Sequence, residues 1–276
     1  MASLNKYEKD SLLLIDSHIH INHLDELRFF FQSAFNNFSI FNHKLTNSKN
    51  FIGVLFLTEV RDYNFFKILY DNTDSFSKQL GYKIERTLED NSLLVSYDEN
   101  KIILIAGQQI ITAENLEILA LGTINKFEYG KDFSATINWI KKEKAIPVIP
   151  WGVGKWFGKR GRIVEDFIQN NTEIFLGDNS GRPLFWPTPK LFKEGINKKI
   201  YTLRGTDPLP IKTQVKKVGR FGFYFFSHID MRYPFLNLKE LIYSLKGNPN
   251  NFGHLENPLR FFKDQFILNF KQRISK

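Results

Sequence analysis

The segment Asp16-Ser17-His18-Ile19-His20 carries the residue types in this chain that are best suited to chemistry. It follows a run of four apolar residues, as expected for a buried strand that ends in polar groups. Side chains on an extended strand alternate with a period of two, so His18 and His20 project from one side and can reach one divalent ion. Asp16 falls on that same side, where it could ligate the ion or orient a histidine. The alternative is a pair of unrelated surface histidines.

A glycine-rich segment, Trp151–Trp156, places Lys155 between two tryptophans. Free backbone N–H groups after a strand, together with a lysine, can hold an anion, although this is not a Walker pattern. Arg182 and Arg204 follow the next two apolar runs, so the three cations are expected on one rim as an anion subsite. Each arginine could equally form a structural pair with a neighbouring aspartate, and the glycine-rich segment could be a tight loop with packed tryptophans.

The elements that must position these side chains are expected from apolar runs and helical spacing. Strands are expected at Leu12–Ile15, Phe51–Leu57, Tyr82–Arg86, Leu93–Tyr97, Ile102–Ala106, Glu117–Leu121, Ile146–Ile149, Glu173–Leu176, Ile200–Leu203 and Phe221–Phe226. Helices are expected at Leu27–Phe38, Asp132–Lys144, Ile163–Asn170, Pro189–Lys198, Leu236–Leu245 and Leu259–Phe270. Strands that alternate with helices predict βαβ units, and residues 82–106 predict a β-meander. Polar residues at six strand ends favour a barrel with an active rim over an open doubly wound sheet.

Composition and charge limit the class of protein. A hydrophobic content of 42%, with 28 Phe, is enough for a folded aromatic core, and the absence of Cys excludes disulfides and thiolate ligands. Without a signal peptide or a run of about 20 apolar residues, we expect a cytoplasmic protein with no transmembrane segment. Residues 1–180 carry 20 basic and 23 acidic residues, whereas residues 181–276 carry 18 and 6. An acidic partner would explain the basic C-terminal third, as would simple drift of composition.

The expected C-terminal helix carries an apolar stripe. Its members are Phe261, Phe262, Phe266 and Phe270. Basic residues flank this stripe, as in helices that lie on a membrane surface. The commoner role of such a stripe is to dock the helix on its own domain.

The Asp-x-His-x-His segment that closes the first strand resembles the opening motif of the polymerase and histidinol phosphatase family, the PHP domains. It is also similar to the wider amidohydrolase superfamily. The resemblance runs loosely over residues 11–210, and only the first motif is strong. It implies a distorted (β/α)7 barrel of PHP type with a small β-meander insertion. Residues 211–276 would add a C-terminal strand and helices to one domain that spans residues 1–276. The family also implies up to three Mn, Zn or Fe ions and the hydrolysis of phosphate esters.

The later motifs of that family are eroded here. Thr58-Glu59-Val60 stands in place of Thr-Asp-His, Gly107-Gln108-Gln109 in place of Gly-x-Glu, Pro150-Trp151-Gly152 in place of Ala-His-Pro, and Thr206-Asp207 in place of Ser-Asp-x-His. The retained ligands are His18, His20, Glu59 and Asp207, which are too few to hold three divalent ions. We therefore expect one divalent metal (Zn, Mn or Fe) on His18, His20 and Asp207, or none.

The sequence thus predicts a metal-dependent, phosphoesterase-like hydrolase that acts on a phosphorylated or otherwise anionic small molecule. The metal would lower the pKa of bound water and polarise the scissile group, and Glu59 or Asp178 would act as general base. The expected substrate-binding residues are Lys155, Arg182, Arg204, Gln109 and Trp151. The alternative is a catalytically inactive descendant that binds an anionic ligand or partner without metal. Nucleic acid is not expected as a partner, since no zinc-finger or RNA-recognition signature is present.

Overall fold

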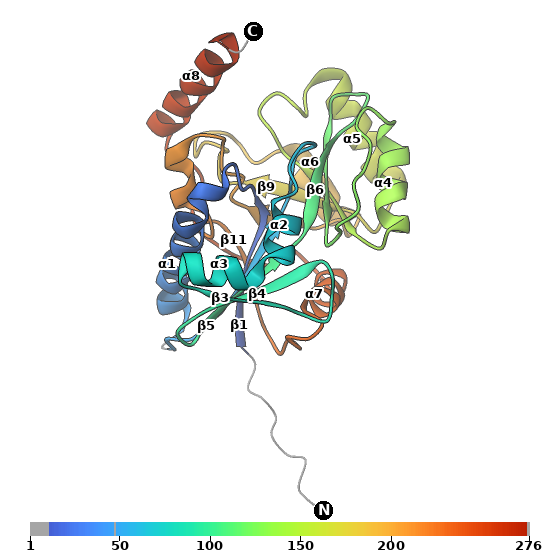
Figure 1. The fold of residues 1–276 in the computed structure, drawn as a ribbon. Coiled ribbons are helices and arrows are strands. Elements are labelled where there is room, and N and C mark those ends of the chain that lie inside the picture. Colours follow the sequence, from blue (N-terminus) through green and yellow to red (C-terminus); the bar gives the residue numbers. More distant parts are fainter. Residues whose placement is uncertain (1–10, 47, 275–276) are drawn as a thin grey trace, which may run out of the picture.

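The computed structural model describes residues 11–46 and 48–274, whose strands form two mixed sheets (Figure 1). The strands are β1 (Ser11–Ile19), β2 (Ile52–Leu57), β3 (Lys83–Arg86), β4 (Ser92–Tyr97), β5 (Asn100–Ile105), β6 (Gly107–Ile111), β7 (Glu117–Leu121), β8 (Ile146–Pro150), β9 (Phe175–Asn179), β10 (Thr202–Gly205), β11 (Gly222–Ser227) and β12 (Asn250–Phe252). One sheet has seven strands in the order β12-β11-β1-β2-β5-β4-β3. The other has five strands in the order β10-β9-β8-β7-β6.

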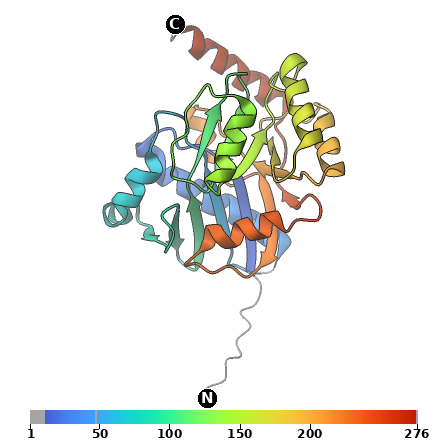
Figure 2. The ribbon, with the colours of Figure 1, turned by 90° about the vertical axis from the view of Figure 1, so that its right-hand side faces the viewer.

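Helices connect the strands, and α1 covers the outer face of the seven-stranded sheet while α4, α5 and α6 cover that of the five-stranded sheet (Figure 1 and Figure 2). α7 instead packs against the core between the two sheets. They are η1 (Leu24–Glu26), α1 (Leu27–Leu45), α2 (Phe65–Asp71), α3 (Thr73–Leu80), α4 (Phe133–Lys142), α5 (Gly158–Asn170), α6 (Lys190–Asn197), η2 (Lys212–Lys217), α7 (Pro234–Tyr243) and α8 (Pro258–Ile274). In both views α8 lies at the opposite end of the molecule from the start of β1. No helix within the described ranges is long and apolar enough to cross a membrane.

The expected (β/α)7 barrel of PHP type is wrong, because the strands do not close into one parallel ring. Parallel pairing holds for β1 with β2, β2 with β5, and the run β8-β9-β10. The connections from β5 to β6 and from β6 to β7 are short and contain no helix, and β6 and β7 pair antiparallel. β7 and β8 also pair antiparallel, although α4 lies between them in the chain. At the other side β11 returns antiparallel to β1 and leads to β12 at the edge. The meander β3-β4-β5 exists as predicted, but it extends the seven-stranded sheet through the pairing of β5 with β2.

Both sheets share one apolar core, and each has a second core on its outer face. The shared core takes inward side chains from strands of both sheets, such as Val54 on β2 and Val148 on β8. A phenylalanine-rich core fills the space between the seven-stranded sheet and α1, with Phe31 and Phe38 fully buried. A third core lies between the five-stranded sheet and helices α4, α5 and α6. Strand alternation therefore decides whether a polar residue at a strand end faces the interior or an outer helix.

Candidate metal centre

An irregularity in β1 decides which way the two histidines of this strand point. Alongside β2, Asp16 lies opposite Leu55 and Ile19 lies opposite Leu57. Three steps along β1 thus match two steps along β2, which is the count of a β-bulge. A bulge shifts the alternation of side chains by one residue, so positions after it change faces relative to positions before it.

The outer core records this change of face. The residues of this segment that pack in the core beneath α1 are Leu12, Leu14, Ile19 and Ile21. His18 and His20 alternate with the two isoleucines and therefore face the interior between the sheets, whereas Asp16 keeps the outward side of the two leucines. This corrects the expectation that Asp16 shares one side with both histidines, since the bulge between them breaks the period of two.

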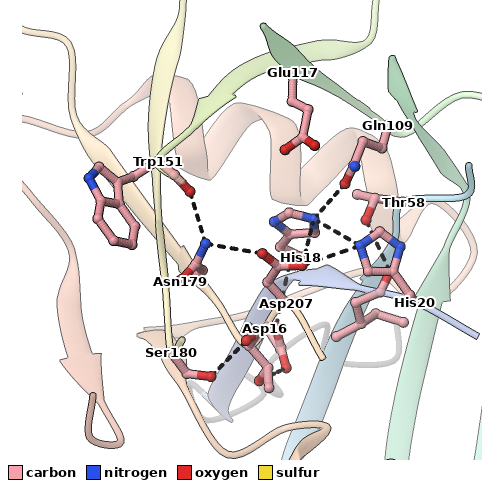
Figure 3. A network of polar contacts seen from close by, with 12 residues as sticks. Asp16, His18, His20, Thr58, Gln109, Glu117, Trp151, Asn179, Ser180 and Asp207 are labelled. Carbon is pink, nitrogen blue, oxygen red and sulfur yellow. Dashed lines mark hydrogen bonds and ion pairs between the residues drawn. The ribbon is translucent and has the colours of Figure 1, made fainter. Parts of the chain in front are cut away.

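His18, His20 and Asp207 meet where the end of β1 lies beside the segment after β10 (Figure 3). Their ligand atoms all lie within 4.8 Å of one another. The Nε2 atoms of His18 and His20 are 3.1 Å apart, and Asp207 Oδ1 is 3.5 Å from the first and 3.4 Å from the second. The structure thus brings together the three side chains that the sequence named as metal ligands.

Gln109 supplies a fourth donor to the same point. Its amide oxygen, on β6, lies 3.0 Å from His18 Nε2. In a tetrahedral zinc site with metal–ligand bonds of about 2.1 Å, neighbouring ligand atoms are about 3.4 Å apart. The separations from His18 Nε2 to the other three donors run from 3.0 to 3.5 Å, close to that spacing. The donor set fits one small divalent cation.

The backbone around Asp207 fixes its carboxylate against the histidines. Asp207 has a left-handed backbone with φ of 50°, an unfavourable conformation for a residue other than glycine and one that is found at functional sites. Its N–H donates to the carbonyl of His18 at 2.7 Å. The amide nitrogen of Asn179 donates both to Asp207 Oδ2 at 3.0 Å and to the carbonyl of Trp151 at 2.9 Å. Trp151 therefore supports the site through its carbonyl, while its ring packs in the core beneath the outer helices.

Asp16 organises the backbone beneath the site and does not ligate with it. Its fully buried carboxylate accepts bonds from Thr206 N at 2.7 Å, from the Thr206 hydroxyl, and from Gly219 N at 2.9 Å. These contacts join β1, the segment after β10 and the loop before β11. Since Thr206 precedes Asp207, they hold the Asp207 ligand against β1. Burial raises the pKa of Asp16 to about 7, although the hydrogen bonds act in the opposite direction.

Burial and neighbouring charges shift the pKa values of His18 and Asp207 in the directions that favour cation binding. Burial lowers the pKa of His18, which favours the neutral imidazole that a metal needs. Burial alone would raise the pKa of Asp207, but His18, His20 and Lys155 outweigh it and bring that pKa well below its usual range. One ionised carboxylate thus lies between two imidazoles, which is a donor set that suits a divalent ion of the first transition row.

Glu117 and Lys155 stand over the cluster. Glu117 is the first residue of β7, and Figure 3 shows its carboxylate directed toward His18. Lys155 pairs with this carboxylate, and both charges act on the cluster, Glu117 on His18 and Lys155 on Asp207. Lys155 was expected from the sequence, but Glu117 was missed. The pattern of alternation could have identified Glu117, because it lies two residues before Leu119 and four before Leu121, which point into the core between the sheets.

Glu59 follows β2 but is engaged outside this cluster. One of its carboxylate oxygens accepts the N–H of Phe66 at 2.9 Å at the start of α2, and the other accepts Lys126 Nζ at 2.9 Å. The side chain is buried and lines a cavity of about 420 Å³ together with Asn64 and Asp90. Its local role is to cap a helix and bind a lysine.

Asp178, Arg182 and Arg204 form their own cluster on the outer face of the five-stranded sheet. Arg182 donates to both carboxylate oxygens of Asp178 at 2.9 Å, and both side chains are buried. Arg204 lies opposite Asp178 in the pairing of β10 with β9, 3.6 Å from its carboxylate, with its guanidinium over the Phe221 ring. Asn179, the next residue on β9, faces the metal ligands, so alternation turns Asp178 away. Of the three expected cations, the structure brings only Lys155 to the site.

Comparison with known proteins adds a fold likeness. No family model and no curated protein matches the chain. The crystal structure of PsfC from Pseudomonas syringae PB-5123 is similar, with a TM-score of 0.55 over 95% of this chain and 99% of PsfC. The two chains share 10% sequence identity, so the likeness concerns the fold alone.

Proposed function

We propose that this protein is a hydrolase that uses one divalent metal ion and acts on a phosphorylated or otherwise anionic small molecule. The observation that carries the proposal is the cluster of His18, His20 and Asp207, whose ligand atoms lie within 4.8 Å of one another, with Gln109 Oε1 at 3.0 Å from His18 Nε2. Two imidazole nitrogens, a carboxylate and a neutral amide suit zinc among the expected metals, with manganese and iron as the other expected occupants. Bound there, the ion would supply Lewis acidity and, at a coordination position beyond the four protein donors, an acidified water.

Glu117 is the residue best placed to move a proton. Its carboxylate faces the ligands without being one of the three closest donors, and Lys155 holds it in place. The two general bases expected from the sequence are engaged elsewhere, Glu59 by Lys126 and a helix N–H, and Asp178 by a buried arginine. We therefore assign proton transfer to Glu117.

Charge around the cluster favours a metal-dependent role over anion binding without metal. Asp207 and Glu117 contribute two negative charges and Lys155 contributes one positive charge, which leaves −1 around the ligands before a metal binds. A divalent cation changes this balance to +1, so the site attracts an anionic substrate when the ion is present and repels it otherwise. Lys155 then serves as the cation that meets the substrate.

Elemental analysis of protein purified without added metal, followed by calorimetric titration with Zn²⁺ and Mn²⁺, tests the proposal. We expect about one equivalent of metal per chain, lost in both His20→Ala and Asp207→Asn. His23→Ala, an exposed histidine three residues further on, is the matched control and should bind metal as the parent does.

Hydrolysis is tested with a panel of phosphomonoesters, beginning with p-nitrophenyl phosphate. Glu117→Gln should retain the metal and lower kcat by roughly a hundredfold or more. Parent protein that binds no metal would refute the proposal. Metal binding without turnover of any ester, with phosphate bound only by the loaded protein, would leave a metal-dependent anion-binding protein in its place.

A further inference from the structure

An exposed apolar surface lies outside the candidate metal centre and is formed by three segments far apart in the sequence. They are the loop between β8 and α5, the loop between β9 and α6, and the first half of α8. The large apolar side chains that these segments expose are Val153, Phe157, Leu184, Phe185, Leu259, Phe262 and Phe266. Leu259 is 82% exposed and Phe266 is 72% exposed, so both side chains present most of their surface to solvent.

Ring contacts join the three segments into one surface, here called the aromatic face. Phe157 stacks on Trp186 with 6.1 Å between ring centroids, and Trp186 lies 6.5 Å from Phe185. Phe185 in turn stacks on Phe262 of α8 at 6.0 Å, with an angle of 14° between the rings. The exposed side chains are therefore continuous and not scattered.

The outward stripe of α8 does not result from a loosely docked helix. Phe261 and Asp264 face inward and are buried, and Asp264 accepts a bond from Gln214 at 2.7 Å. Lys217 adds a buried ion cluster, with Glu256 as its nearer partner and Asp264 at 3.5 Å. Because these contacts fix the rotation of the helix, a second apolar face remains outside.

That second face follows helical spacing. Leu259, Phe262 and Phe266 are separated by three and four residues, which places them on one side of α8. Phe270, the fourth member of the stripe expected from the sequence, lies outside the described side chains. The helix therefore docks through one face, as the commoner interpretation of the sequence had it, and leaves another apolar face exposed.

The charges around the aromatic face have one sign. Within residues 152–160, 183–189 and 257–267 the ionisable side chains are Lys155, Lys159, Arg160, Arg260, Lys263 and Asp264. The only acidic group among them, Asp264, is turned inward onto Lys217. Lys159, Arg260 and Lys263 are exposed beside the aromatic rings. A partner must therefore combine apolar groups with negative charge.

We propose that the aromatic face binds an anionic lipid surface, with the rings at the level of the acyl chains and the basic residues at the headgroups. Phenylalanine and leucine on one face with lysine and arginine at its rim is the pattern of interfacial binding. A second copy of this chain fits less well, because each copy carries a net charge of +9 and the same basic rim. Trp186 also contacts Trp151, whose carbonyl supports the metal ligands, so lipid docking brings the rim of that centre close to the headgroups.

Sedimentation with vesicles tests this proposal. We expect the full chain to bind vesicles of phosphatidylcholine and phosphatidylglycerol, and to bind pure phosphatidylcholine vesicles much less. The double variant Phe262→Ser, Phe266→Ser should lower binding by about tenfold or more, because two exposed rings no longer enter the apolar layer. Arg260→Glu with Lys263→Glu should lower it by about fivefold per charge and make the remaining binding less sensitive to salt. All four side chains are exposed, so each variant should keep the melting temperature of the parent.

Phe226→Ser, on β11, is the matched control, because this ring is 55% exposed but lies outside the aromatic face. It should bind vesicles as the parent does. The proposal is overturned if the parent fails to bind anionic vesicles, or if the control loses as much binding as the double variant. It is also overturned if the parent sediments as a dimer in analytical ultracentrifugation and the double variant as a monomer, since a second copy then covers the face.

Discussion

Replacing Asp16 by asparagine tests how the metal ligands are supported, because the shape is kept and one acceptor is lost. In the parent, the carboxylate accepts Thr206 N at 2.7 Å, the Thr206 hydroxyl, and Gly219 N at 2.9 Å. An amide offers one oxygen and turns an NH₂ group toward the remaining donors. The hydroxyl can rotate to accept from it, but the N–H of Gly219 cannot. Leaving one buried donor without an acceptor costs about 1–3 kcal/mol, and we expect Asp16→Asn to lower the free energy of unfolding by that amount.

The size of this loss should depend on pH. Burial raises the pKa of Asp16 from 3.8 to about 7 in the folded protein. Between these values the folded state binds the proton more tightly than the unfolded state, so this contribution to stability is complete below the lower pKa. It is lost as the pH rises through about 7. The asparagine variant carries no such proton, so the unfolding free energy of the parent minus that of the variant should decrease as the pH rises from about 4 to about 7.

Urea unfolding followed by tryptophan fluorescence measures both quantities, at several pH values for parent and variant. Asp25→Asn, an exposed aspartate on η1, is the matched control and should change stability by less than about 0.5 kcal/mol at every pH. If the parent instead gains stability over Asp16→Asn as the pH rises, the Asp16 carboxylate is ionised in the folded state. The effect of its hydrogen bonds on the pKa would then be larger than the effect of burial. An unchanged unfolding free energy in Asp16→Asn would refute the assigned role of Asp16 altogether.

Two further substitutions separate the metal centre from the buried arginine cluster. Gln109→Glu places a second carboxylate on the ligands and should tighten Zn²⁺ binding in calorimetry by about tenfold or more, whereas Gln32→Glu, which adds the same charge on the exposed side of α1, should leave it unchanged. Equal affinities in parent and Gln109→Glu would show that this amide is not a ligand. Arg182→Gln should lower the free energy of unfolding by about 3 kcal/mol or more, because the buried Asp178 keeps only Arg204 at 3.6 Å. Stabilisation of the parent by phosphate that Arg182→Gln abolishes would instead identify an anion subsite there.

Much of the strand and helix order could be predicted from local patterns, but the closure of the sheet could not. The run β8-α5-β9-α6-β10 is parallel as the alternation of apolar runs predicts, and β3-β4-β5 is a meander. The barrel failed at residues 107–111, which the sequence presents as the polar end of one strand and which form β6 instead. Only one residue separates the end of β5 from the start of β6, which leaves no room for a crossover helix, so β6 cannot pair parallel with β5. Local spacing does not mark the boundary between β5 and β6. Residues 102–111 form one mostly apolar run, and only Gly107 and two glutamines interrupt it.

Within the site, the sequence could identify which residue types follow each strand, but not which face they take. On β9 and β10, strict alternation turns Asp178 and Arg204 to the outer face, and the inward neighbour Asn179 holds Asp207. The end of each strand was enough to identify these residues as candidates. The face that each side chain takes follows from alternation along the strand, and the preceding residues do not reveal it because they are apolar on both faces. Polar residues at neighbouring strand ends therefore form one site only if they also lie on the same face of the sheet.

The first strand shows why that face was hidden. The run Leu12–Ile15 is apolar at every position, so it fits either face, and the sequence carries no mark of the bulge that follows. A regular strand would place the two histidines on the side of Leu12 and Leu14, beneath α1 and away from Asp207. The sequence indicates the direction of the histidines only after the polar residues. There Ile19 and Ile21 alternate with His18 and His20, and the two isoleucines pack in the outer core. Leu12 and Leu14 share this outer core with Ile19 and Ile21 because the strand slips by one residue between the two pairs. With the bulge in place, the apolar residues on each side of the motif share the core beneath α1, and the histidines take their place opposite Asp207.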